Sequence, residues 1–357
     1  MTSLVAEQLT AAELAAHFHP IPGYLAAASC GVAADVTVAA LQEDQQAWAA
    51  GRRGPADYDR VVSRTRRLYA DLVRVPSEWV AIGSTTSGLV ASVAAALPDG
   101  AEVLVAEDEF TSIIFPFLVG GRLSVRSVPL AELAQAVGPR TALVSFSLIQ
   151  SATGDVADTD AIVAAAARVG ALTLADLTQA AGLLPIAADR FDVTVCHAYK
   201  WLCAPRGVAF MTVRPAAADR LVPVSAGWYA GEDPWASCYG TEFTPARSAR
   251  RFDTSPAWQA FAGAEAAVEL FSRADLADVW RHCVGLADEL CRGLGIEPRH
   301  QAIVSWPDPE GCQLAALTAA GIQASGRAGR VRVAFAVWNT PDDVAAVLVA
   351  LGRGQGR

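Results

Sequence analysis

Short runs of apolar residues alternate with alanine-rich helical segments through the middle of this 357-residue chain. A short apolar run is typical of a strand buried on both faces, and a helix between two such runs allows the strands to lie parallel. The pattern therefore predicts an α/β protein with a mostly parallel sheet. The predicted strands are residues 79–83, 102–106, 123–128, 141–148, 171–176, 192–196 and 207–213.

Helical patterns lie on both sides of this region. They cover residues 11–19, 34–50 and 60–73 before it and residues 257–272, 274–294 and 341–352 after it. Thr340 stands where it can cap the last of these helices. Residues 225–256 contain Gly, Pro, Trp and Tyr without periodicity, which predicts irregular structure. We therefore expect an N-terminal segment (1–20), a large domain (21–245) and a small α+β domain (246–357).

Charge and cysteine content exclude several classes of protein. The net charge is −9 and no basic block occurs, which argues against nucleic acid and against an anionic membrane surface. Seven scattered cysteines without a CxxC pair predict neither a disulfide framework nor a metal site. The most apolar stretch, residues 161–187, is too interrupted to span a membrane, and the N-terminus lacks the features of a signal peptide. A cytoplasmic protein is expected.

One side chain stands out by its rarity. Of the 28 lysine and arginine residues, Lys200 is the only lysine. In a chain so rich in arginine, a lysine is retained by chance or because an amine is needed. An arginine cannot supply that amine, because its guanidinium stays protonated whereas a buried lysine can lose its proton.

A carboxylate and this amine follow neighbouring predicted strands. Asp176 ends the strand 171–176, and His197, Ala198, Tyr199 and Lys200 follow the strand 192–196. Parallel strands end at the same edge of a sheet, where ligands bind. Pyridoxal 5'-phosphate requires both groups: an amine that condenses with its aldehyde and a carboxylate beside its ring nitrogen. Taken alone, Asp176 could equally be a helix N-cap.

Two further features fit this cofactor. Gln179, one turn beyond Asp176, is placed to donate a hydrogen bond to the ring hydroxyl. The segment Gly83–Gly88, which contains Thr85 and Thr86, follows a predicted strand and opens a helix. Free backbone N–H groups and the helix dipole make such a position a phosphate site, although Ser and Thr caps are common.

These motifs identify a family. The chain resembles the class V aminotransferase family, the cysteine desulfurase-like group of fold-type I pyridoxal phosphate enzymes, from about Tyr24 to the last helix. The most specific stretch is residues 175–210, with an Asp, a Gln three residues later, and a lysine followed by a Pro-x-Gly turn. The resemblance implies a large domain with a seven-stranded, mainly parallel sheet and a small α+β domain.

The resemblance also implies roles for single residues. Lys200 would hold the cofactor as a Schiff base, Asp176 would pair with the ring nitrogen and Gln179 would contact the ring hydroxyl. The phosphate would be held by Thr85, Thr86, His197 and Tyr199.

Other implied roles concern the substrate and the partner subunit. Phe110 would stack on the cofactor, Gln150 would touch cofactor or substrate, and Arg332 would bind the substrate α-carboxylate. Phe110 could instead be core, and Arg332 a surface strand residue. Thr254 would reach the phosphate in a second subunit, which implies a homodimer. Trp228, with Tyr229 and Trp235, could line a substrate pocket or form a packed domain junction.

Departures from the family pattern limit the reaction. The segment 321–330 lacks the catalytic cysteine of desulfurases and Cys312 lies too far upstream, so persulfide chemistry is disfavoured. Because Phe110 replaces a histidine, Lys200 is the natural base for the Cα proton.

After this deprotonation, transamination, β-elimination and epimerisation are all open, and a further resemblance favours β-elimination. Residues 227–235 and the setting of Phe110 resemble members near isopenicillin-N epimerase and C–S lyases. The leading prediction is therefore a C–S lyase of bacterial specialised metabolism acting on an amino acid. An aminotransferase, an amino-acid epimerase and a non-catalytic binding protein with this fold remain alternatives.

Overall fold

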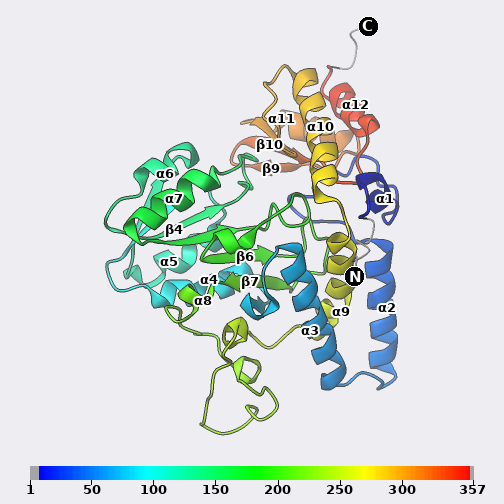
Figure 1. Ribbon diagram of the computed structural model, residues 1–357. Coiled ribbons are helices and arrows are strands. Elements are labelled where there is room, and N and C mark those ends of the chain that lie inside the picture. The colour runs from blue at the N-terminus through cyan, green and yellow to red at the C-terminus, as the bar shows by residue number, and fades with distance from the viewer. Residues whose placement is uncertain (1–7, 354–357) are drawn as a thin grey trace, which may run out of the picture.

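The computed structural model describes residues 8–353, and the first seven residues of the predicted N-terminal segment lie outside this range. Its centre is a seven-stranded sheet in the order β1-β7-β6-β5-β4-β2-β3 (Figure 1). All seven predicted strands are present. Their bounds are β1 (Val80–Gly83), β2 (Glu102–Ala106), β3 (Ser124–Val128), β4 (Thr141–Ser147), β5 (Leu172–Asp176), β6 (Val193–His197) and β7 (Ala209–Val213).

The sheet is parallel except for β7, which pairs antiparallel with both β6 and β1. The other pairs, from β6 across to β3, are parallel. A parallel connection needs a dozen or more residues, usually with a helix. Residues 198–208 contain no helix, so the chain turns directly from β6 into an antiparallel neighbour. This short connection carries Lys200.

Helices cover both faces of the sheet, and the two cores lie on opposite faces. Ile82 of β1 belongs to one core and its neighbour Ala81 to the other. The helices between consecutive strands are α4 (Thr86–Ala96), α5 (Phe115–Leu118), α6 (Leu133–Ala136) and α7 (Thr159–Val169), and α8 (Pro215–Ala218) follows the last strand, β7.

Three long helices lie side by side against one edge of this layer: α2 (Asp35–Ala49), α3 (Pro55–Leu72) and α9 (Trp258–Ser272) (Figure 1). Tyr58 of α3 stacks on Trp258 of α9 with ring centroids 5.1 Å apart, and Tyr69 of α3 stacks on Phe210 of β7 at 4.0 Å.

A second, three-stranded antiparallel sheet lies at one end of the molecule (Figure 1). Its order is β8-β10-β9, with β8 (Ile303–Pro307), β9 (Ser325–Arg327) and β10 (Arg330–Ala334). The helices α10 (Leu276–Leu294), α11 (Cys312–Ala319) and α12 (Pro341–Ala350) accompany it. Thr340 is the N-cap of α12, as predicted, and its backbone N–H donates to Asp343 (2.9 Å).

The predicted irregular segment 225–256 contains two short 3-10 helices, Trp228–Ala230 and Ala249–Phe252, and no strand or α-helix. Its first part belongs to the yellow-green loops that project from the molecule at the end opposite the small sheet (Figure 1). No helix within residues 8–353 is long and apolar enough to cross a membrane.

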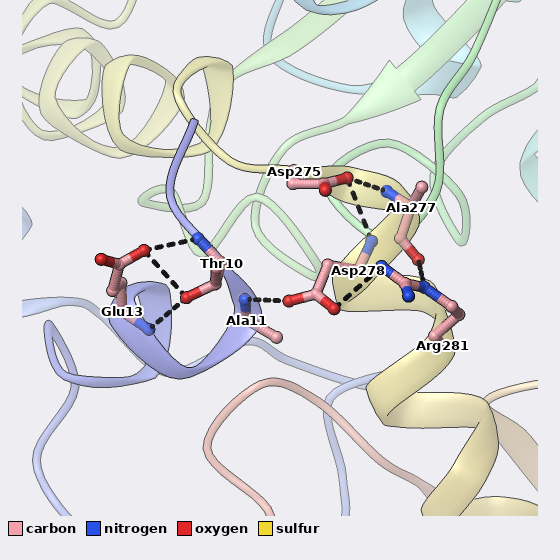
Figure 2. Close-up of polar contacts among 7 residues, drawn as sticks. All are labelled: Thr10, Ala11, Glu13, Asp275, Ala277, Asp278 and Arg281. Atoms are coloured by element: carbon pink, nitrogen blue, oxygen red, sulfur yellow. Dashed lines mark hydrogen bonds and ion pairs between the residues drawn. The ribbon is translucent and has the colours of Figure 1, made fainter. Parts of the chain in front are cut away.

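A hydrogen bond between the first turns of helices α1 and α10 joins the N-terminal segment to the C-terminal half of the chain (Figure 2). Thr10 caps α1 (Ala11–Ala15) in a capping box with Glu13, and Asp275 caps α10. Asp278 in the first turn of α10 accepts a hydrogen bond from the N–H of Ala11 (2.7 Å) and one from Arg281 (3.0 Å). The helix predicted over residues 11–19 is present, but it ends at Ala15.

Candidate active site

A narrow pocket surrounds Lys200 at the carboxyl ends of β4, β5 and β6. Lys200 itself is 5% exposed. The pocket is lined by Thr86, Phe110, Ser147, Ser151, Asp176, Thr178, Gln179, His197, Tyr199 and Lys200. Seven of the predicted site residues therefore meet in one place.

Burial changes the basicity of the Lys200 amine. Removal from water lowers its pKa to about 8, with Arg332 and Arg327 lowering it further and Asp176 opposing them. The neutral amine is accordingly far more accessible near pH 8 than in an exposed lysine. A nucleophilic or basic lysine needs such an environment.

Asp176 is the buried carboxylate of this pocket. Its Oδ1 accepts a hydrogen bond from the N–H of Thr178 (2.8 Å), and Ser147 of β4 lies beside it in register. Burial raises the pKa of Asp176 despite the opposing charge of Lys200. A cationic group in front of this carboxylate would offset the cost of its burial.

Gln179 has its side-chain amide fully engaged with the protein. Its Oε1 accepts from the indole N–H of Trp201 (2.7 Å), and its Nε2 donates to Ala28 O (3.0 Å) and to Ser151 Oγ (3.1 Å). The amide thus links the segment after β5 to the segment around residue 28 and to Ser151. This network holds Gln179 in the pocket wall.

One end of the pocket offers polar groups to an anion. Thr85 is the N-cap of α4, with its Oγ1 accepting from the N–H of Gly88 (3.2 Å), and Thr86 is buried behind it. His197 is buried, and its Nε2 has no hydrogen-bond partner within residues 8–353. Burial and nearby positive charges lower its pKa to about 4, so the ring is neutral at pH 7. A buried polar nitrogen without a partner is expected to meet a ligand.

An aromatic ring covers the open side of the amine. The Phe110 ring centroid lies 5.2 Å from Lys200 Nζ, and the side chain is 46% exposed. This exposure rules out the alternative that Phe110 belongs to the core. The Tyr199 ring lies edge-on to the His197 ring, with ring centroids 4.5 Å apart. The guanidinium carbon of Arg206 lies 5.0 Å from the centroid of the Tyr199 ring.

Arg332 is a buried arginine at the other end of the pocket. It lies on β10 and is 1% exposed, so the alternative of a surface strand residue is wrong. Its Nη1 donates to the Oγ (2.9 Å) and to the carbonyl of Ser151, its Nη2 to Ser29 Oγ (2.7 Å) and its Nε to Ser325 Oγ (3.2 Å). Burial lowers its pKa to about 10, which leaves it charged at pH 7. Three serines from separate segments therefore hold a cation that makes no ion pair within residues 8–353.

Some predicted site residues lie outside this pocket. Gln150 is buried with its Nε2 donating to Glu107 O (2.7 Å), and its neighbour Ser151 lines the pocket instead. Thr254 donates its N–H to Ile82 O (3.2 Å) beside β1. Trp228 contacts Tyr229 and Trp235 with ring centroids 5.1 and 5.3 Å away, in a packed aromatic cluster.

Several pocket residues were not predicted from the sequence. Ser147 and Ser151 line the pocket, and Ser29 and Ser325 hold Arg332 beside it. All four are ordinary polar residues with no distinguishing spacing. Glu109, adjacent to Phe110, is buried and accepts hydrogen bonds from the N–H (2.7 Å) and Oγ (2.5 Å) of Ser147. Within the described part of the chain no group of His, Cys, Asp and Glu side chains is arranged to hold a metal.

A glycine also contributes to the site. Gly31 donates its N–H to Tyr199 O (2.9 Å), and a Cβ at this position would lie 1.9 Å from the carbonyl oxygen of Lys200. Glycine is therefore the residue that allows the segment around residue 30 to approach the backbone that carries the amine.

Solved structures show the class of fold. A cysteine desulfurase, CsdA, from Escherichia coli matches with a TM-score of 0.83 and 19% identity over 97% of this chain and 98% of that one. The cystine C-S lyase C-DES matches with a TM-score of 0.82 and 20% identity over 92% and 97%. At this level of identity the likeness concerns the fold, which is that of fold-type I pyridoxal phosphate enzymes.

The family follows from the sequence itself. Residues 26–328 match the family model described as Aminotransferase class-V, and the chain therefore belongs to this family, whose enzymes use pyridoxal phosphate. The fold class, the family and the cofactor class predicted from the sequence are confirmed.

The curated relatives match only part of this chain and only part of their own length. An uncharacterized aminotransferase, YcbU, of Bacillus subtilis is 28% identical over 61% of this chain and 60% of its own length. A kynureninase of Deinococcus radiodurans is 27% identical over 69% and 62%. The isopenicillin N epimerase of Streptomyces clavuligerus is 30% identical over 36% of each chain. The matched region thus spans about three fifths of the first two relatives.

Proposed function

We propose that this chain is an enzyme that binds an amino acid beside pyridoxal phosphate and removes the proton from its Cα. The observation that carries the proposal is the position of Lys200. The only amine-bearing side chain of the protein is buried between the carboxylate of Asp176 and the guanidinium of Arg332, under the exposed ring of Phe110.

The pocket offers side chains to the aldehyde carbon, the ring nitrogen, the ring face and the phosphate of the cofactor. The amide of Gln179, which was predicted to contact the ring hydroxyl, is hydrogen-bonded to Trp201, Ala28 and Ser151. Lys200 would be joined to its aldehyde carbon, Asp176 would face its ring nitrogen, and Phe110 would cover its ring. Thr85, Thr86 and the Nε2 of His197, which has no hydrogen-bond partner among residues 8–353, would hold its phosphate at the start of α4. When bound, this group withdraws electrons from the substrate Cα.

Arg332 would bind and orient the substrate carboxylate. Its guanidinium is already positioned by Ser29, Ser151 and Ser325, so little ordering is needed when the carboxylate arrives. A planar guanidinium is suited to bind a carboxylate with two parallel hydrogen bonds.

Lys200 would then accept the Cα proton on its Nζ. Its pKa of about 8 lies near neutral pH, where a group can both take up and release a proton efficiently. Phe110 places a hydrocarbon ring over the amine, so no acid or base is supplied from that side chain. The transfer of the proton would therefore fall to Lys200 itself.

For the reaction that follows, β-elimination of a sulfur substituent is our leading proposal. Lys200 takes the Cα proton, the Cβ–S bond breaks, and its electron pair leaves with sulfur as a thiol. Hydrolysis of the remaining fragment releases pyruvate and ammonia. Support comes from the absence of a cysteine in residues 321–330, where β9 and β10 meet, and from the fold shared with the C-S lyase C-DES.

Two alternatives begin with the same deprotonation. An aminotransferase would transfer the amino group to a keto acid, and an epimerase would return the proton to Cα from the other face. The relatives include an uncharacterized aminotransferase and an epimerase. A cysteine desulfurase is less favoured, since Cys312 is the first residue of α11 and exposed rather than part of the hairpin. A non-catalytic binding protein of this fold would have no use for the intact Lys200 site.

We also propose a setting for this activity. The enzyme would work as a cytoplasmic homodimer in a bacterial biosynthetic pathway, with Thr254 reaching the cofactor phosphate of the partner subunit. The domain division at residues 20 and 245 belongs to the same proposal.

Lys200 permits an unusually direct test of cofactor attachment. The protein with pyridoxal phosphate should absorb near the violet edge of the visible spectrum, and borohydride should abolish this band and add the cofactor mass to one peptide. Since Lys200 is the only lysine, that peptide must contain it. Lys200→Ala should show neither the band nor the added mass. A Lys200→Ala variant with the same spectrum as wild type would refute the site.

Product analysis separates the reactions. Pyruvate and ammonia from a cysteine S-conjugate would indicate β-elimination, whereas a form that needs a keto acid for recovery would indicate transamination. Exchange of the Cα proton with inversion and no loss of substrate would indicate epimerisation. Arg332→Ala should weaken binding of every amino acid tested, and unchanged affinity would remove the carboxylate assignment.

A further inference from the structure

Two arginines share one serine hydroxyl at the small-sheet side of the pocket. Arg332 Nη2 donates to Ser29 Oγ at 2.7 Å, and Arg327 Nη2 donates to the same oxygen at 3.2 Å. Neither guanidinium makes an ion pair with an acidic side chain within residues 8–353. Both lie close enough to Lys200 to lower the pKa of its amine.

The position of Arg327 is determined by the hairpin that carries it. β9 and β10 are joined by Ala328 and Gly329, both with positive φ (48° and 71°), as in a tight two-residue turn. Arg332 pairs with Ser325 across this hairpin, and Arg327 pairs with Arg330. Side chains of paired and next-but-one residues share a sheet face, so Arg327 and Arg332 are on the same face.

The charges around the pocket leave this end positive. Asp176 balances Lys200, and Glu109 is bound to Ser147 on the side of Asp176. Arg206 lies over Tyr199, beside His197, where it is available to a phosphate. Arg330 lies on the same face, but its guanidinium is held by Ser305. The guanidinium groups of Arg327 and Arg332 are therefore the two that meet at Ser29. The substrate α-carboxylate would supply one negative charge there, which leaves the exposed guanidinium of Arg327 without an acidic partner within residues 8–353.

We propose that the substrate carries a second anionic group, and that Arg327 is the residue that selects it. The inference rests on the proposed function, in which Arg332 binds the α-carboxylate. The substrate class is then an amino acid, or a cysteine S-conjugate, with a carboxylate or similar anion on its side chain. Arg327 is a specificity-determining residue and takes no part in proton transfer.

The test compares two small acids that differ by one carboxylate. Succinate and butyrate each have four carbons, and their binding to the protein with pyridoxal phosphate is measured by calorimetry. Succinate should bind the wild type at least about tenfold more tightly than butyrate, the factor typical of one hydrogen-bonded charge pair. In Arg327→Gln this ratio should fall to near one, with butyrate affinity unchanged.

Arg330→Gln is the matched control. Arg330 lies in the same hairpin, but its guanidinium is held by the carbonyl (2.8 Å) and the Oγ (3.0 Å) of Ser305 on β8. This variant should keep the preference for succinate. Arg332→Gln should weaken both acids, which tests the carboxylate assignment separately from the selectivity of Arg327.

Three results would overturn the inference. The first is a wild type that does not distinguish the two acids, and the second is an Arg327→Gln variant that binds both more weakly by the same factor. The third is a lower affinity of Arg327→Gln for pyridoxal phosphate, which would assign Arg327 to the cofactor. None of these depends on turnover. Failure of the proposed function would instead appear as a missing absorbance band and unlabelled Lys200.

Discussion

Glu109 is a second buried carboxyl group near Asp176, the residue that ends β5. Burial raises its pKa to about 7, the charge of Asp176 adds to this effect, and the hydrogen bonds from Ser147 oppose it. Within the pocket, Glu109 thereby orients Ser147, which lies next to Asp176 in register. Its charge state is expected to change close to physiological pH.

The raised pKa of Glu109 predicts a pH dependence of stability. The folded protein holds this proton up to about pH 7, whereas the unfolded chain releases it near pH 4.5. Stability is therefore lost as the pH rises through this window, by on the order of 3 kcal/mol. Glu109→Gln cannot ionise, so its free energy of unfolding should fall less between pH 5 and pH 7.5 than that of wild type.

Denaturant unfolding at the two pH values measures this difference. Glu242→Gln, at an exposed glutamate, should follow the wild-type pH dependence. Parallel curves for wild type and Glu109→Gln would show that Glu109 is ionised throughout in the folded protein.

At the scale of elements, a buried ion pair joins α3 to the start of the sheet. Arg66 of α3 contacts Asp253 (2.6 Å), and Asp253 also accepts the N–H of Ile82 in β1 (2.8 Å). Arg66 donates a further hydrogen bond to Val80 O (2.5 Å). Asp253 precedes Thr254, so this pair also positions the segment that we expect to reach a partner subunit.

Removal of the carboxylate should destabilise the protein strongly. Asp253→Ala leaves the buried guanidinium of Arg66 without a counter-charge, which typically costs about 3–5 kcal/mol. Glu269→Ala removes a partner of Arg64 from an ion pair whose side chains are 41% and 48% exposed, and it should cost less than about 1 kcal/mol. Thermal and denaturant unfolding compare the two variants, and similar losses would contradict this account of the pair.

At the scale of the whole molecule, apolar side chains lie exposed in the segment that follows Phe110. Phe115, Leu118 and Val119 are 56%, 49% and 76% exposed, and they follow Phe110 within nine residues. Tyr239 and Phe243 of the projecting loops are also exposed. Clustered exposed apolar residues are typical of an interaction surface.

A homodimer should cover these residues. Sedimentation of the protein should give twice the chain mass of 37.3 kDa. Val119→Asp should shift the mass toward the monomer and weaken cofactor retention, because Thr254 is expected to serve the other subunit. Val349→Asp, at a residue of α12 that is 65% exposed, should leave the dimer intact. A monomeric wild type that retains the cofactor would exclude a shared site.

The sequence alone determined the sheet and one half of the site. Strands buried on both faces consist of apolar runs, and the residues that follow parallel strands meet at one edge of the sheet. The meeting of Asp176 and Lys200 therefore follows from the order of residues along the chain. Thr86 and His197 followed from the same rule, since each lies at the end of a strand or just beyond it.

Only the tertiary structure decided the other half of the site, in which serines from separate segments surround Arg332. Ser29, Ser151 and Arg332 come from segments more than a hundred residues apart, and no local pattern relates them. Their meeting depends on how the small sheet packs against the large one. Local periodicity reports which side of an element is buried, whereas contact between remote segments depends on the packing of the whole chain.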